Sequence, residues 1–185
     1  MAKFKKQEIE ISKIYLDNEN PRHETIDNEP EIIAYLLSKD FVMPRAADIA
    51  KAGSTSPLER FAVLPHPVIK GAFVSAEGNR RLCALKLLHN PDKAITNSRK
   101  KQLRALVKRW GPPQKLIDAV VFEDRKDARH WLELRHEGTL KGVGTRPWNA
   151  RQKERFDRGG NKPVNPNTQA ALLLEYALKR KLITD

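Results

Sequence analysis

Two adjacent arginines follow a glycine in the segment Glu77-Gly78-Asn79-Arg80-Arg81. The residues before this segment are typical of a strand and those after it of an apolar helix, so Gly78 is expected to turn one into the other. The first N–H groups of a helix lack intrahelical acceptors and, with the helix dipole, attract anions. Arginine adds charge-assisted hydrogen bonds to phosphate oxygens. The pattern predicts a phosphate site made by Gly78, Asn79, Arg80 and Arg81. The alternative is an ordinary helix start with two solvated arginines.

Glu77 directly precedes this turn. A carboxylate at such a point can hold a divalent metal ion that bridges phosphates, or it can activate a water molecule. Glu77 is therefore the candidate catalytic residue and the candidate Mg²⁺ ligand. The alternative is a solvated glutamate at the end of a strand.

Basic side chains are concentrated in two later stretches that contain few acids, and the chain has a formal charge of +12. Such a surplus attracts polyanions. We expect contact with the DNA backbone rather than with base edges, and a solvated basic surface is the alternative. The first stretch contributes Arg99, Lys100, Lys101, Arg104, Lys108 and Arg109. The second contributes Arg146, Arg151, Lys153 and Arg155.

The single cysteine, Cys83, excludes an intramolecular disulfide and a cysteine-based zinc site. It lies one turn into the apolar helix expected after Gly78, where a thiol is buried and unreactive. No apolar run approaches the roughly 18 residues of a membrane span. The basic N-terminus lacks the apolar stretch of a signal peptide. We expect a cytoplasmic protein that does not contact a membrane.

The apolar pattern also predicts the elements that hold these side chains. Strands are expected over 8–16, 60–64, 72–76 and 117–122. Helices are expected over 28–38, 45–52, 79–88, 96–110, 125–136, 149–158 and 168–181. Strands and helices mix up to about residue 140 and helices alone follow, which is typical of an α+β domain with a helical extension. We expect the domain over 1–144 and the extension over 145–185.

Four segments, in order, resemble the N-terminal domain of the ParB family, whose fold is shared with sulfiredoxin. They are Asn20-Pro21-Arg22, the stretch from Ile49 through Gly53 to Pro57, the box from Glu77 through Arg81 to Ala84, and 127–156 after the strand Val120-Val121-Phe122. The resemblance covers roughly residues 8–156 and implies a small mixed sheet. Sulfiredoxins carry a reactive cysteine where this chain has Asn79, so reductase activity is not expected.

The resemblance implies a bound nucleoside triphosphate, CTP or ATP, together with Mg²⁺. It implies that Ser54, Thr55 and Ser56 face the base. Arg135 and His136 occupy the place of the family's second phosphate contact, although the family pattern Glu-Asn-x-x-Arg is absent from the sequence there. The loop containing Asp17 and Glu19 is implied to face the same pocket.

Charge and resemblance together predict a ParB-like protein that binds a nucleoside triphosphate and DNA, in DNA segregation or in plasmid or phage maintenance. One alternative is a metal-dependent DNA nuclease or a nucleoside triphosphatase of the same fold. A second alternative is a non-enzymatic interaction module. A homodimer is a further expected partnership.

Overall fold

The computed structural model describes residues 3–21, 23–136, 138, 143, 152 and 168–182. The chain divides into two compact units, Met1–Leu132 and Glu133–Asp185. The division expected after residue 144 lies outside the described residues, and so does the helix expected over 149–158 apart from residue 152. Among the described helices, none has the length and apolar character that a membrane span requires.

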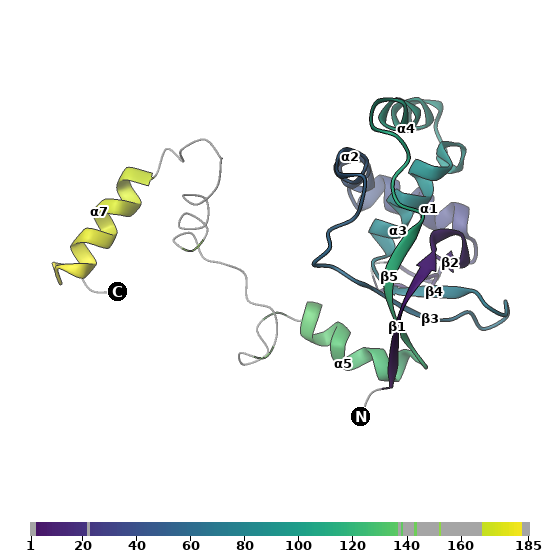
Figure 1. Ribbon diagram of the computed structural model, residues 1–185, viewed down its shortest axis with the longest axis horizontal. Coiled ribbons are helices and arrows are strands. Elements are labelled where there is room, and N and C mark those ends of the chain that lie inside the picture. Colours follow the sequence, from purple (N-terminus) through teal and green to yellow (C-terminus); the bar gives the residue numbers. More distant parts are fainter. Residues whose placement is uncertain are drawn as a thin grey trace. The chain divides into compact units, whose positions relative to one another are not determined.

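A five-stranded mixed sheet lies at the centre of the first unit (Figure 1), with the strand order β1-β5-β3-β4-β2. Neighbouring strands are antiparallel in the pairs β1–β5 and β3–β4 and parallel in the pairs β3–β5 and β2–β4. The expected α+β class with a mixed sheet is confirmed. The strands are β1 (Phe4–Glu10), β2 (Ile14–Tyr15), β3 (Phe61–Pro65), β4 (Phe73–Glu77) and β5 (Leu116–Phe122).

The single strand expected over 8–16 is wrong, because this segment supplies both edges of the sheet. β1 ends at Glu10, a 3₁₀ turn spans Ile11–Lys13, and β2 begins at Ile14 on the opposite edge. Ile11 and Ile14 are three residues apart and both are buried, which matches the three-residue period of a 3₁₀ turn. Alternation of apolar and polar residues in so short a segment does not show where the two-residue period of a strand gives way to the three-residue period of a 3₁₀ turn.

Four helices cover one face of the sheet and form the main core with it. The opposite face carries a smaller cluster that joins Leu64, Ala76 and Phe122 to Ala128 of α5 (Arg125–His136). In the second unit, α7 (Thr168–Lys179) corresponds to the last expected helix. The covering helices are α1 (Glu29–Lys39), α2 (Val42–Ala52), α3 (Asn79–His89) and α4 (Asn97–Trp110).

The start of α1 was predictable from its capping residue, whereas the start of α2 was not predictable from the sequence. α1 starts as expected, because Asn28 Oδ1 accepts a hydrogen bond from Glu31 N over 3.0 Å. α2 begins at Val42 and not near residue 45, because Phe41 adopts a left-handed conformation with φ 53° and turns the chain directly out of α1. A bulky aromatic residue is rarely found in that conformation, so the sequence offers no signal for this start.

Candidate functional site

Gly78 alone separates the end of β4 at Glu77 from the start of α3 at Asn79. Its φ is 98°, and a Cβ atom on it would lie 2.6 Å from Cδ1 of Phe61. Leu82 N donates to Gly78 O over 2.8 Å, so the regular hydrogen bonds of α3 begin there. The N–H groups before Leu82 are those that a helix leaves without intrahelical acceptors. The expected strand–glycine–helix turn is therefore present, and it accepts only glycine.

The two arginines of the turn have different surroundings, and Arg80 is the one with no partner among the described residues. Within the described part of the chain, Arg80 has no ion pair and no side-chain hydrogen bond, and its Nε atom is shielded from solvent. A buried polar atom without a partner is rare in folded proteins and calls for an explanation. An anion bound at the helix N-terminus would supply that partner.

Arg81 is 4% exposed and is held by the segment that leads into β3. Its Nη1 donates to Glu59 O over 2.7 Å, and its Nη2 donates to Arg60 O over 3.1 Å. The guanidinium carbon lies 4.5 Å from the centre of the Phe61 ring. Two donors of Arg81 thus serve the protein itself, and the phosphate contact expected of Arg81 stays a prediction.

Glu77 faces Arg81, with 3.6 Å between its Oε1 and Arg81 Nη2. No group of three histidine, cysteine, aspartate or glutamate side chains that could hold a metal ion occurs among the described residues. Mg²⁺ is commonly held by one or two carboxylates together with the phosphates of a ligand, so a cage made by the protein alone is not required. In this structure the Glu77 carboxylate is paired with Arg81, and its predicted roles as ligand of a phosphate-bound Mg²⁺ ion and as catalytic residue stay predictions.

Asn79 directs its buried side chain to the backbone of Asp17. Asp17 N donates to Asn79 Oδ1 over 2.9 Å, and Asn79 Nδ2 donates to Asp17 O over 3.4 Å. The turn is thereby fixed to the loop after β2. The resemblance implied that this loop faces the pocket. The role of Asn79 seen in the structure is to fix the turn to this loop.

The carboxylate of Asp17 is fully buried and pairs with Arg125, the first residue of α5. Arg125 Nη1 donates to Oδ2 over 3.1 Å and Nη2 donates to Oδ1 over 2.5 Å. Hydrogen bonding to Asp17 raises the pKa of the Arg125 guanidinium. Arg125 is a residue that the sequence analysis missed. It lies 108 positions from Asp17, so no local pattern links the two.

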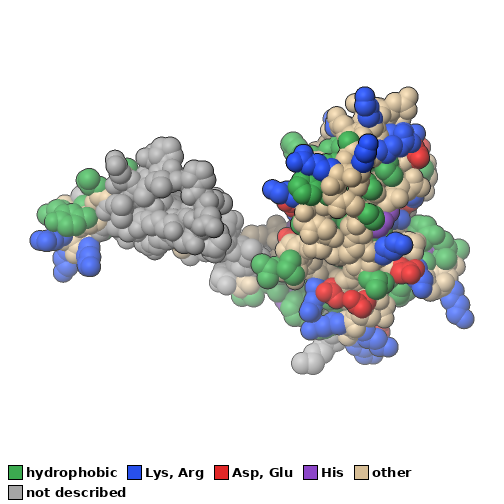
Figure 2. Space-filling view, turned by 45° about the horizontal axis from the view of Figure 1, so that its top comes forward, with side chains coloured by type: hydrophobic (Ala, Val, Ile, Leu, Met, Phe, Trp, Pro, Cys, Tyr) green, Lys and Arg blue, Asp and Glu red, His purple; other side chains and the backbone are tan. Residues whose placement is uncertain are grey.

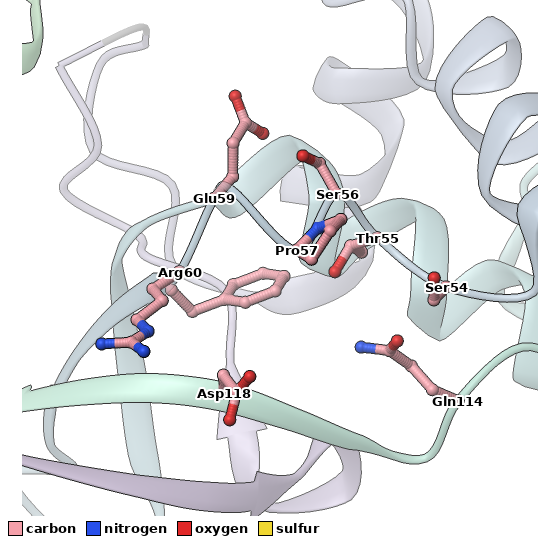
Figure 3. Close-up of a pocket in the computed structure, with 9 residues that line it drawn as sticks. Ser54, Thr55, Ser56, Pro57, Glu59, Arg60, Gln114 and Asp118 are labelled. Carbon is pink, nitrogen blue, oxygen red and sulfur yellow. The ribbon is translucent and has the colours of Figure 1, made fainter.

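A cleft of about 140 Å³ lies between the segment before β3 and the first half of β5 (Figure 3). It contains all three residues expected to face a base, Ser54, Thr55 and Ser56. The other lining residues are Pro57, Glu59, Arg60, Phe61, Gln114 and Asp118. Phe61 belongs to the cleft and also contacts the position of Gly78, so the cleft adjoins the turn.

The backbone of Gln114 anchors the far side of the cleft. Gln114 N donates to Gly53 O over 3.0 Å, and its carbonyl oxygen lies 3.0 Å from Nε2 of His89. In Figure 3 the amide of Gln114, which precedes β5, projects into the space between Thr55 and Asp118, and Asp118 lies on β5. The backbone of Gln114 thus connects the cleft to α3 through His89 and to the residue after α2 through Gly53.

The basic residues expected on α4 lie on a helix without acidic residues. Lys101, Arg104, Lys108 and Arg109 are exposed, whereas Leu103 is buried. Figure 2 shows lysine and arginine side chains over the upper part of the first unit. Three of these basic side chains contact neighbouring residues. Arg104 Nη2 lies 2.5 Å from Asp92 Oδ1, and Arg99 Nη1 donates to Gln102 Oε1 over 3.2 Å. The guanidinium carbon of Arg109 lies 4.8 Å from the centre of the Trp110 ring. Lys100 is half-buried.

Several predicted residues belong to other parts of the chain. Arg135 and His136 are exposed residues of the last turn of α5 and fall in the second unit, so their contact with a phosphate stays a prediction. Arg146, Arg151, Lys153 and Arg155 lie outside the described residues.

Cys83 is fully buried in α3, as expected. Burial raises the pKa of its thiol to about 12, so the thiolate that cysteine chemistry requires does not form near neutral pH.

No protein-family model and no curated protein matches the chain. Among solved structures, the chain is similar to the C-terminally truncated chromosome-partitioning protein ParB from Caulobacter crescentus, complexed with CTP-gamma-S. The TM-score is 0.44 and the sequence identity is 15%. The similarity covers 83% of this chain and 61% of that chain. This is the family that the motifs of the sequence resemble.

Proposed function

We propose that the chain binds a nucleoside triphosphate, with the phosphates at the N-terminus of α3 and the base in the cleft lined by Ser54, Thr55 and Ser56. The observation that carries this proposal is the side chain of Arg80. It is a half-buried cation, without a partner among the described residues, at a helix start whose glycine conformation brings the backbone close to a ligand.

Two features together favour a nucleotide, and the second distinguishes it from a simple anion. The turn offers backbone N–H groups and one guanidinium, which suits phosphate oxygens. The adjoining cleft has an aromatic wall at Phe61 and polar groups at Thr55, Gln114 and Asp118, which suits a polar ring. Arg81 links the two parts through Glu59 and Arg60, which supports the proposal that one ligand occupies both.

A DNA-binding role for the same protein is supported by the formal charge of +12 and by the exposed basic side of α4. These features favour contacts to phosphates rather than readout of base sequence. We infer a nucleotide-dependent DNA-binding protein, as in DNA segregation or in plasmid or phage maintenance. The ion pair between Glu77 and Arg81 gives no support to the nuclease alternative.

Calorimetric titration of the full chain with CTP, ATP, GTP and UTP, with and without Mg²⁺, tests nucleotide binding. Arg80→Ala is expected to weaken binding about tenfold to a hundredfold, because one charge-assisted hydrogen bond is lost. Arg109→Ala on α4 removes the same charge away from the turn and should leave the affinity unchanged. Equal triphosphate affinity in wild type and Arg80→Ala would overturn the assignment of the turn.

A further inference from the structure

Two carboxylates line the cleft, Glu59 and Asp118, and Glu59 is paired with Arg81. The binding of a polyanion does not explain the presence of Asp118. This residue lies on β5, and within the described residues it has no ion pair and no side-chain hydrogen bond. A carboxylate close to phosphate groups would oppose their binding through like-charge repulsion. Asp118 is therefore placed to meet the part of a ligand that is not phosphate.

The stability of the sheet does not explain Asp118 either. In the register of β1 and β5, Asp118 lies opposite Glu8, and both residues are exposed. Like charges directly opposite each other on neighbouring strands destabilise a sheet. An asparagine or threonine at position 118 would avoid this repulsion, so the acid is better explained by its place in the cleft.

The chemistry of the cleft restricts the ring that fits it. An ionised carboxylate only accepts hydrogen bonds, and Asp118 shares the cleft with the amide of Gln114, which both donates and accepts (Figure 3). Cytosine, adenine and guanine each carry an exocyclic amino group that can donate to a carboxylate. Uracil offers one N–H between two carbonyl oxygens, and these oxygens would repel Asp118.

We propose that Asp118 selects the base, so that the site accepts nucleotides whose base carries an exocyclic amino group and rejects uridine nucleotides. The proposal rests on the proposed function, because it concerns the ligand of the same site. Asp118 reads the amino group, Gln114 adapts to the neighbouring ring atoms, and the turn at Gly78 holds the phosphates.

Calorimetry with the full chain and CTP, ATP, GTP and UTP tests the selection. UTP is expected to bind about tenfold to a hundredfold more weakly than the tightest of the other three, the value of one charge-assisted hydrogen bond. Asp118→Asn supplies an amide that can donate to the O4 oxygen of uracil. Asp118→Asn should bind UTP more tightly relative to CTP, ATP and GTP, so that the ratio of the UTP affinity to the highest of the other three approaches one.

Glu8→Gln is the matched control, because it removes the same charge from the opposite strand without altering the lining of the cleft. In Glu8→Gln the ratio of the UTP affinity to the affinities for the other three nucleotides should equal that of wild type. An equal change in Glu8→Gln and Asp118→Asn would assign the effect to net charge and overturn the proposal. Equal binding of all four nucleotides by wild type would overturn the selection but leave nucleotide binding intact, whereas binding of none of them would remove the proposed function itself.

Discussion

Arg80 and Arg81 are neighbours in the sequence, but removing their side chains should have opposite consequences. Arg81 satisfies the carbonyl oxygens of Glu59 and Arg60 and balances two carboxylates. Arg81→Ala should therefore lower the free energy of unfolding by about 2–4 kcal/mol. Arg80→Ala removes no partner and should change it by less than about 0.5 kcal/mol. Urea denaturation followed by circular dichroism compares the two, and equal losses would contradict the separation of their roles.

Gly78 is restricted both by its backbone and by its neighbours. Alanine there would pay about 1–2 kcal/mol for the left-handed conformation and about 1–3 kcal/mol for overlap with Phe61. Gly53→Ala is a matched control, because Gly53 has φ 74° but no atom within 4 Å of the added Cβ. Thermal or urea unfolding should show a clearly larger loss for Gly78→Ala, and similar losses would show that the Phe61 contact yields easily.

At the scale of elements, the Asp17–Arg125 pair fixes the start of α5 to the loop after β2. Arg125→Ala would leave the buried carboxylate of Asp17 without its partner, which should cost about 1–3 kcal/mol of unfolding free energy, less than for a fully buried pair because Arg125 is 44% exposed. Adding Asp17→Asn should restore part of the loss, because a neutral amide is less costly to bury. The exposed Lys126 on the same helix provides the control variant Lys126→Ala. No recovery in the double variant would argue against an electrostatic origin.

The contact between α1 and α3 should respond to acid. Glu29 Oε1 lies 2.6 Å from Lys86 Nζ, and Glu29 Oε2 lies 2.8 Å from Lys93 Nζ. Burial raises the pKa of Glu29, the two ammonium groups lower it, and the net shift is downward. A lowered folded-state pKa stabilises the protein above the ordinary glutamate pKa of about 4.3, and this contribution is lost as the pH falls through the folded-state value. Unfolding measured between about pH 3 and 6 should show a shallower acid decline for Glu29→Gln than for wild type.

For the whole molecule, DNA binding through phosphates requires a steep dependence on salt. The logarithm of the association constant should fall against the logarithm of salt concentration with a slope of about −0.9 per phosphate contacted. Replacing Lys101, Arg104 and Lys108 together with alanine should weaken binding to all sequences alike and reduce the slope. A variant with alanine at Lys3, Lys5 and Lys6 loses the same charge near β1 and should change the slope less. A flat salt dependence in wild type would contradict the role of α4.

The sequence alone was sufficient for features that depend on neighbouring residues. The turn at Gly78, the cap of α1 at Asn28 and the buried α3 all follow from glycine conformation, capping chemistry and apolar periodicity. The resemblance implied that Ser54, Thr55 and Ser56 face a base; the structure places all three on the lining of one cleft, and their contact with a base stays a prediction. These features lie within short stretches, so local chemistry determines them.

Tertiary structure decided which side chains of those stretches bond to distant parts of the fold and which have no partner among the described residues. Arg81 finds its acceptors 21 and 22 residues away, Asn79 finds Asp17 62 residues away, and Arg125 finds the same aspartate across 108 residues. The separation of β1 and β2 to opposite edges of the sheet likewise depends on their pairing with β5 and β4. Partners this distant meet only when the sheet brings their strands and loops together, and no periodicity in the sequence encodes that meeting.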